Sequence, residues 1–332
     1  MKVTNQDAVT AGRVYAAPSE CPPPEWYYID IGNICNLKCP FCVTGNGVTP
    51  ARDKGLMTLE AFKVILSKIE SYATFVCLFN WGEPFLNKSL LPMVSLLHER
   101  GISIHLDSNL TLRDFDDDEA EAIVRSGLSS LFASIDGVTQ ESYEKYRVGG
   151  SLERALGNLR QLVAARRRLG SETPGLIWAF YLNRYNEHEI DLARQMAKEI
   201  GVDIWFKPLS CTDDFQTTRI KPGADVFAAP PLASKLHPHH RMLASVQLHP
   251  MLHAACRQPF AAGVINWNGD VYPCCVMSGE RFKLGNLIEQ EFDEVWNGAP
   301  IQSCRTFLRN FGPVQGGDSV CEKFCTAVPK HA

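Results

Sequence analysis

The chain has 332 residues, 45% hydrophobic and 21% charged, which is enough to bury one large core and a small additional unit. Its formal net charge of −4, with both signs interspersed, excludes the basic field that nucleic-acid binding requires. No apolar run of about 18 residues occurs and the first residues are polar, so we expect neither a membrane span nor secretion and place the protein in the cytoplasm. Twelve cysteines then favour metal or redox chemistry over disulfides, because the cytosol keeps thiols reduced.

The apolar pattern along the chain predicts strands that alternate with helices. Residues 1–24 carry no periodicity, end in a proline run and are expected to form an extended tail. A strand at 26–31 follows, and then an amphipathic helix at 58–71 with Thr58 as its expected N-cap. Further strands are expected near 74–80, 102–106, 130–135, 176–182 and 203–206, with helices near 89–100, 116–126, 151–169 and 187–200.

This alternation predicts an α/β core over residues 25–210. Strand–helix repeats at such spacing form a parallel sheet with right-handed crossovers, either as an open sheet or as a partial barrel. Ligands of these sheets bind where the loops after the carboxyl ends of the strands converge. We therefore examine each motif for its position after a predicted strand.

A second unit is expected after a connector over 211–250 that is rich in proline and histidine. The region 251–332 is rich in cysteine and contains a hairpin pattern over 264–272. Asn268-Gly269 within this pattern is a typical two-residue hairpin connection. We predict a small C-terminal cysteine-rich domain.

Three cysteines follow the first predicted strand, at Cys35, Cys39 and Cys42. Soft thiolates suit iron–sulfur clusters or zinc. A structural zinc site needs a fourth ligand, and the nearest downstream cysteine, Cys77, lies on the next predicted strand. Three ligands with one open position favour a reactive centre. With Phe41 before the last cysteine, the C-x3-C-x2-C spacing resembles the defining motif of the radical S-adenosylmethionine (radical SAM) superfamily.

This resemblance implies a partial (β/α)6 barrel of the TIM type and a [4Fe–4S] cluster on the three cysteines. It implies that SAM occupies the fourth iron, that an electron from the cluster cleaves SAM, and that the resulting 5′-deoxyadenosyl radical takes a hydrogen atom from the substrate. Phe41 is expected near the adenine. A flavodoxin or ferredoxin is the implied electron donor, and neither a nucleic acid nor a membrane is an expected partner.

Two more segments resemble SAM-binding segments of this superfamily. Trp81-Gly82-Glu83-Pro84 follows the second strand and is similar to the Gly-Gly-Glu-Pro segment, in which backbone and Glu accept hydrogen bonds from the SAM ammonium. Trp81 replaces the first glycine, and the alternative is a turn with a solvated Glu. After the third strand, Ser108-Asn109 resembles the turn that reaches the ribose and methionine groups.

After the fourth strand, Ser134-Ile135-Asp136-Gly137 and the downstream Arg147 resemble a segment of the radical SAM enzymes that carry extra clusters. The resemblance implies that Ser134 bonds the SAM carboxylate or ribose and that Arg147 pairs with the carboxylate. The alternative is that Arg147 caps its helix or is solvated. Asn183, after the fifth strand, occupies the place from which a side chain reaches the ribose.

A second cysteine set resembles the start of a SPASM/Twitch auxiliary-cluster domain, through the spacing of Cys256, Gly269 and Cys274. The C-x2-C-x5-C-x3-C run of a full SPASM domain is absent, which favours the shorter Twitch form with one auxiliary [4Fe–4S] cluster. Cys275 and Cys304 are the substitutes if the assignment is wrong, and a structural zinc site is the alternative. The expected ligands are Cys256, Cys274, Cys321 and Cys325.

The resemblance to Twitch enzymes implies oxidation of a sugar, aminocyclitol or nucleoside-like small molecule in a biosynthetic pathway. Radical epimerisation, elimination, decarboxylation and peptide modification are the alternatives, and a zinc-binding interaction protein is the non-enzyme alternative. The short segment before the first strand disfavours a cobalamin-binding or peptide-recognition domain there. Cys77 and Cys211 are candidate hydrogen-atom donors or, alternatively, inert core residues. After the sixth strand, the candidate substrate contacts or, alternatively, surface residues are Lys207, Asp213 and Asp214.

Overall fold

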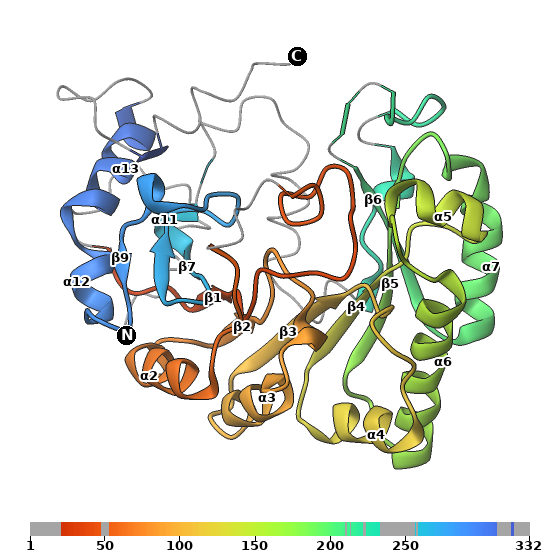
Figure 1. Cartoon of the computed structure of the whole chain (residues 1–332), viewed down its shortest axis with the longest axis horizontal. Helices are drawn as coiled ribbons and strands as arrows, with labels where there is room; N and C mark the ends of the chain where they lie inside the picture. Colours follow the sequence, from red (N-terminus) through yellow and green to blue (C-terminus); the bar gives the residue numbers. More distant parts are fainter. Residues whose placement is uncertain are drawn as a thin grey trace.

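The computed structural model describes residues 21–47, 53–209, 211–212, 214–221, 224–232, 256, 258–310 and 320–321. One curved sheet runs through these residues in the strand order β6-β5-β4-β3-β2-β1-β7-β8-β9, and helices cover its outer side (Figure 1). All strand pairs from β6 to β7 are parallel, so the predicted partial barrel is confirmed. The core strands are β1 (Trp26–Ile29), β2 (Phe75–Cys77), β3 (Ser103–Ser108), β4 (Ser130–Ser134), β5 (Gly175–Leu182) and β6 (Asp203–Pro208).

The predicted helices follow these strands. Thr58 caps the first of them as predicted, because its side chain accepts a hydrogen bond from the Ala61 N–H at 3.1 Å. One helix, α5 (Gln140–Tyr146), was not predicted, because a helix this short carries too little apolar periodicity. The predicted helices are α2 (Leu59–Ile69), α3 (Leu90–His98), α4 (Asp117–Arg125), α6 (Leu152–Leu169) and α7 (Ile190–Ile200).

The cysteine-rich C-terminal region continues the core sheet. Its first strand, β7 (Ala262–Ile265), pairs in parallel with β1, and β8 (Asp270–Tyr272) and β9 (Gly285–Asn286) extend the same sheet. The hairpin lies where it was expected, but its loop has three residues, 267–269, and ends at Gly269 with a φ of +87°. A residue in this left-handed conformation is typical of three-residue hairpin loops. The boundaries predicted at 24, 210 and 250 stay predictions.

The described part of the C-terminal region also contains the helices α11 (Gln258–Ala261), α12 (Phe292–Trp296) and α13 (Ala299–Asn310). They lie beside β7 and β9 on the left of Figure 1. The indole of Trp296 donates to the Pro22 carbonyl at 3.0 Å, so the first described residues contact α12.

The two faces of the sheet differ in chemistry, because side chains alternate between faces along each strand. The outer face is apolar and buried beneath the helices, as at Val76, Ile104 and Leu131. The opposite face, here called the inner face, carries polar and aromatic side chains from neighbouring register positions. It includes Tyr28, Cys77, His105, Asp107, Ser130, Phe132, Ser134, Ala179, Tyr181, Trp205 and Lys207.

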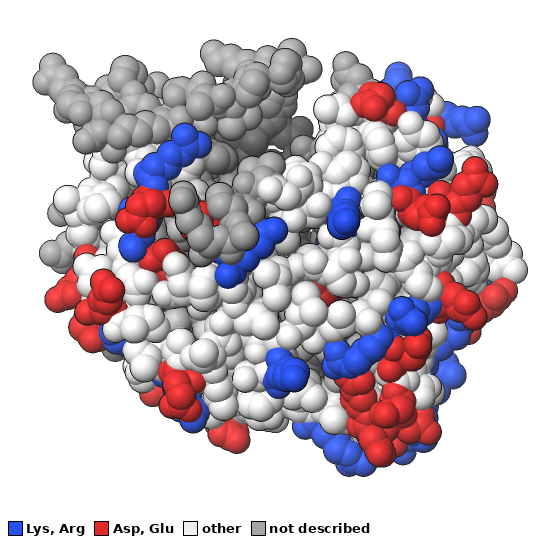
Figure 2. Space-filling view, viewed as in Figure 1, with Lys and Arg blue, Asp and Glu red and all other residues white. Residues whose placement is uncertain are grey.

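Charged side chains of both signs are interspersed on the molecular surface, as Figure 2 shows for one side. Arg168, for example, lies between Asp117 and Glu121, at 2.9 and 3.0 Å. This mixture agrees with the absence of a basic field predicted from composition. Among the described helices, none is long and apolar enough to cross a bilayer.

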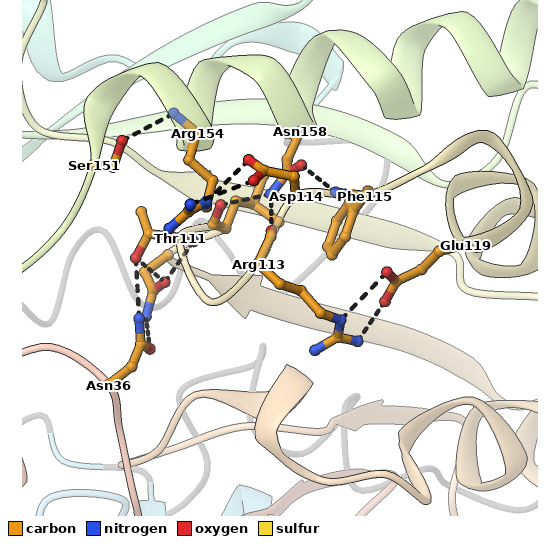
Figure 3. A network of polar contacts seen from close by, with 11 residues as sticks. Asn36, Thr111, Arg113, Asp114, Phe115, Glu119, Ser151, Arg154 and Asn158 are labelled. Carbon is orange, nitrogen blue, oxygen red and sulfur yellow. Dashed lines mark hydrogen bonds and ion pairs between the residues drawn. The ribbon is translucent and has the colours of Figure 1, made fainter.

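The loop after β3 is fixed by one buried amide on α6 (Figure 3). The Asn158 side chain donates to the carbonyls of Leu110 and Arg113, at 2.9 and 2.7 Å, and accepts from the Phe115 N–H at 2.8 Å. Leu110 has a φ of +54°, a conformation that residues other than glycine seldom adopt. The three hydrogen bonds therefore hold a strained loop next to the end of β3.

We predict that Asn158→Leu lowers the free energy of unfolding by about 2–4 kcal/mol, because it leaves three backbone groups without their partner in a dry environment. Urea unfolding followed by circular dichroism measures the change. The matched control is Gln161→Ala on the same helix, because this amide reaches only Asp117 on the solvent side. Equal losses for both variants would contradict the role given to Asn158.

Candidate functional site

The loop that carries Cys35, Cys39 and Cys42 lies directly against the end of α5. The Lys38 N–H donates to the Val148 carbonyl at 2.9 Å, and the Cys42 N–H donates to the Cys39 carbonyl at 3.2 Å. Burial raises the pKa of Cys35 to about 12 and also raises that of Cys39. Since a metal binds the thiolate, loading this loop releases protons.

Gly82 brings the loop after β2 into contact with this cysteine loop. A Cβ atom at Gly82 would lie 1.9 Å from the Gly32 carbonyl oxygen, so no other residue fits there. The adjacent Glu83 N–H donates to the Ile34 carbonyl at 2.8 Å. The residue that departs from the family pattern, Trp81, has its N–H 3.4 Å from the Asp30 carboxylate. The loop is therefore positioned by close backbone approach.

The Glu83 carboxylate is buried and joins this loop to the end of β3. One oxygen accepts from the Ser108 hydroxyl at 2.7 Å and the Phe85 N–H at 3.2 Å, and the other accepts from the Asn109 N–H at 2.9 Å. Burial raises the pKa of Glu83. The side chain is only 3% exposed, so the alternative of a solvated Glu is wrong. Pro84 begins the short 3-10 helix η3 (Pro84–Leu86) that follows.

Asn109 connects the end of β3 back to the cysteines. Its side-chain amide donates to Asn36 Oδ1 at 3.0 Å and lies 3.7 Å from Cys35 Sγ. Asn36 in turn donates to the Thr111 hydroxyl at 3.1 Å, within the network of Figure 3. The structure thus brings Gly82, Glu83, Ser108 and Asn109 together beside Cys35, and their contacts to SAM stay predictions.

A buried ion pair lies at the ends of β4 and β5. Asp136 accepts from the Tyr181 N–H at 2.6 Å and pairs through its other oxygen with Arg147, whose Nη1 lies 4.0 Å from Cys39 Sγ. Burial raises the pKa of Asp136, and the Arg147 charge opposes this shift. Arg147 is the C-cap residue of α5, where its backbone N–H donates to the Tyr143 carbonyl at 2.9 Å, while its guanidinium is largely buried against Asp136. Ser134 is buried at the end of β4.

Phe41 belongs to an aromatic group at the edge of the same site. Its ring stacks on Tyr146, with centroids 6.3 Å apart, and meets the edge of Phe215 at 4.9 Å. Asn183 is fully buried, and its side-chain oxygen accepts from the Tyr185 N–H at 2.9 Å. Phe41 lies in the cysteine loop and Asn183 directly follows β5, and their roles toward the adenine and ribose stay predictions.

Several buried polar atoms of the site have no partner among the described residues: Asp30 Oδ2, Tyr143 Oη and Asn183 Nδ2. Such atoms are rare in folded proteins and indicate a missing ligand or water. Three soft thiols on one loop are also the donor set of an iron–sulfur cluster. In such a cluster each thiolate would bind a different iron, so the three thiols need not converge on one point. Among the described residues they form no group that could hold a single metal ion. The residues present therefore fit SAM and a cluster.

The second cysteine set borders the inner face. Cys274 and Cys275 follow β8, and their thiols hydrogen-bond to each other, which lowers the pKa of Cys275 and raises that of Cys274. Burial raises the pKa of Tyr28 on the inner face, and the neighbouring thiols of Cys275, Cys77 and Cys274 raise it further. The Asn80 amide donates to the Cys275 carbonyl at 2.9 Å, joining this loop to the core.

The other expected auxiliary ligands are only partly described. Burial raises the pKa of Cys256 to about 11, with smaller contributions from Cys274 and Cys304 nearby. Cys321 is buried in the same core, and Cys325 lies outside the described residues. The choice between these cysteines and the substitutes Cys275 and Cys304 stays a prediction.

The two candidate hydrogen-atom donors lie in different surroundings. Cys77 is fully buried on the inner face of β2, in register with Tyr28, and burial raises its pKa strongly. Cys211 is half-buried, and its thiol lies 3.5 Å from the Leu209 carbonyl oxygen. Their role as donors stays a prediction.

Sequence reasoning missed several polar residues of the site. His105 lies on the inner face, with Nδ1 2.8 Å from Ser130 Oγ and Nε2 2.9 Å from Asp107 Oδ1. Asp30 is buried at the end of β1, and Asn36 lies between two cysteines. His105 and Asp30 have no motif around them and are distinguished only by their positions within or at the end of a strand, whereas Asn36 occupies a variable position inside the cysteine motif.

Comparison with known families decides the assignment. A model described as the radical SAM superfamily matches residues 29–193, and one described as an iron–sulfur cluster-binding domain, SPASM, matches residues 256–326. The chain belongs to the radical SAM superfamily. The radical SAM domain binds SAM and a [4Fe–4S] cluster, and the SPASM domain binds auxiliary iron–sulfur clusters.

Curated relatives of this radical SAM enzyme include a GTP 3′,8-cyclase of Alkaliphilus oremlandii, 25% identical over 54% of each chain. The chain spans about half the length of that relative. A mycofactocin maturase, MftC, of Mycobacterium ulcerans is 24% identical over 80% of this chain and 73% of its own.

Solved structures share the fold. BtrN in complex with AdoMet and 2-DOIA has a TM-score of 0.51 and 15% identity, covering 87% of this chain and 88% of its own. Streptococcus suis SuiB bound to the precursor peptide SuiA has a TM-score of 0.62 and 14% identity, covering 96% and 74%. At such identities the likeness is one of fold.

We predict that the stability of the protein falls as the pH rises from about 4 to 7, partly because of Asp30. Burial raises the pKa of this carboxyl from 3.8 to about 7. The folded state therefore holds the Asp30 proton more tightly than the unfolded state, and this contribution is lost as the pH rises through 7. Asp30→Asn should flatten the fall in thermal midpoint between pH 5 and 8. Asp114→Asn, at an exposed carboxylate, is the control and should keep the wild-type profile.

Proposed function

We propose that this radical SAM enzyme oxidises a sugar, aminocyclitol or nucleoside-like small molecule by two electrons. The carbinol C–H bond would lose a hydrogen atom, and the substrate radical would then lose a proton and an electron to give a ketone. When bound, SAM and its cluster supply the 5′-deoxyadenosyl radical that takes the hydrogen atom, and the auxiliary cluster supplies the acceptor for the second electron.

The observation that carries this proposal is that described cysteines of both regions border the same inner face. Cys39 lies beside Arg147 and Asp136 at the end of β4, while Cys274 and Cys275 lie beside Tyr28 and Cys77. A substrate on this face would contact the radical source and the electron acceptor in one enclosed place. A redox-neutral reaction such as epimerisation needs no such acceptor.

The residues of this chain would bind and orient the substrate and cofactor. Glu83, through Ser108 and Asn109, holds the loop on which SAM is expected to lie. The Arg147–Asp136 pair keeps a fixed cation beside Cys39. The buried aromatic rings of the inner face exclude water, which protects a substrate radical from side reactions. A flavodoxin or ferredoxin would supply the first electron.

Peptide modification is the second candidate, and a specific likeness favours it. The structure of SuiB bound to a precursor peptide aligns with 96% of this chain, and a maturase relative spans most of it. Both candidates require SAM cleavage, so they differ only in the substrate from which hydrogen is taken.

We predict that anaerobically reconstituted protein contains about eight irons, and that the triple variant Cys35→Ala, Cys39→Ala and Cys42→Ala retains about four, because each [4Fe–4S] cluster holds four. On reduction, only the wild type should convert SAM to 5′-deoxyadenosine. Cys21→Ala is the control at a buried cysteine outside both expected sets. Stoichiometric zinc without iron uptake in the wild type would instead support the interaction-protein alternative.

We also predict that aminocyclitols and amino sugars deuterated at a carbinol carbon transfer deuterium to 5′-deoxyadenosine, with one ketone formed per SAM consumed. The double variant Cys256→Ala and Cys274→Ala should still transfer deuterium but form little ketone, since the second electron then lacks its acceptor. Mass spectrometry of nucleoside and product measures both. Deuterium transfer only from labelled peptides would favour the peptide candidate, and an epimer in place of a ketone would contradict oxidation.

A further inference from the structure

A buried lysine lies at the carboxyl end of β6, and none of the residues that the structure describes is an anionic partner for it. Lys207 is 8% exposed, and its Nζ lies 4.6 Å from the ring centroid of Trp205, 5.1 Å from that of Phe132 and 5.6 Å from that of Tyr181. No described residue forms a hydrogen bond or ion pair with this ammonium group. A buried cation normally has an anionic or hydrogen-bonding partner.

The aromatic rings around Lys207 form a rigid cage. Ile177 and Ala179 pack with Phe132 and Trp205 in a separate apolar cluster, and the Trp205 indole donates to the Phe227 carbonyl at 3.2 Å. Ring faces attract the ammonium, which keeps it in place, but they leave its three N–H donors without acceptors. The cage therefore orients a charge whose hydrogen-bonding capacity is unused.

The charged groups around Lys207 leave a net positive charge. Asp136 is the carboxylate near Lys207, and its two oxygens are occupied by the Tyr181 N–H and by Arg147. Asp107, in register with Phe132 on the same face, lies 2.9 Å from His105. Among the described residues at this strand end, Lys207, Arg147 and Asp136 sum to one positive charge. One further anionic group at Lys207 would balance them and accept the free N–H bonds.

We propose that Lys207 binds an anionic group of the substrate, a carboxylate or a phosphate. This inference rests on the proposed function and narrows its substrate to a molecule that carries such a group. Lys207 lies in register with Tyr181 on the inner face, two residues beyond the Trp205–Ala179 pair and beside Asp136. A substrate anchored there would extend over Phe132 toward His105 and Asp107.

The proposal is tested by fluorine NMR on the reconstituted holoenzyme, with trifluoroacetate as the carboxylate probe, monofluorophosphate as the phosphate probe and trifluoroethanol as a neutral control. The wild type should broaden the line of at least one anion and not that of the alcohol. Lys207→Gln should weaken binding by about tenfold or more, because a hydrogen bond to a charged group is lost. Lys207→Arg keeps the positive charge and should retain part of the anion binding.

Lys145→Gln is the matched control, because Lys145 lies over the Tyr185 ring at 6.0 Å but is exposed on α5. It should bind the anions as the wild type does. Circular dichroism and thermal melting verify that each variant is folded. If Lys207→Gln does not fold, the comparison of Lys207→Arg with the wild type still decides the test. Whichever anion broadens more identifies the substrate group as a carboxylate or a phosphate.

Three results would overturn the proposal: broadening that is unchanged in Lys207→Gln, no broadening of either anion by the wild type, or loss of the signal on loading with SAM. The last result would assign the lysine to the cofactor. A wild type that cleaves SAM but binds neither anion would leave the proposed function standing without this site. Lys207-dependent binding in a protein that cleaves no SAM would support the site and remove the proposed function.

Discussion

The buried carboxylate of Glu83 is the interaction on which the site depends. It accepts from the Ser108 hydroxyl and from the backbone of Asn109 and Phe85, so it joins the loop after β2 to the end of β3. The Asn109 side chain continues this connection to Cys35, so the loop that carries Cys35 is held indirectly by the same carboxylate. A group this deeply buried is stable only while its donors are present, so the loops are positioned together or not at all.

The sheet places the two cysteine sets beside one another. β7 pairs directly with β1 and β8 with β7, so the C-terminal strands continue the core sheet, and the Asn80 amide after β2 holds the Cys275 carbonyl beside the inner face. An auxiliary cluster held by a separately moving domain would have no fixed distance to the substrate. Continuous backbone hydrogen bonding removes that freedom and suits electron transfer between fixed centres.

Two cations of the inner face, Arg147 and Lys207, differ in their surroundings. The Arg147–Asp136 pair neutralises itself, whereas Lys207 is held by aromatic rings alone among the described residues. Rings exclude water and so strengthen any ion pair formed with a ligand. The proposed recognition of an anionic substrate would therefore depend on one desolvated ammonium, that of Lys207.

The sequence by itself determined the alternating core, the family motif at Cys35, Cys39 and Cys42, and the position of each SAM-binding segment after a strand. Periodicity and spacing are local properties, so they are readable without coordinates. Only the tertiary structure decided that β7 joins β1, that Glu83 is buried against Ser108, and that Lys207 lies within three rings. These features join residues distant in the chain, and their energies come from burial and register, which no local pattern encodes.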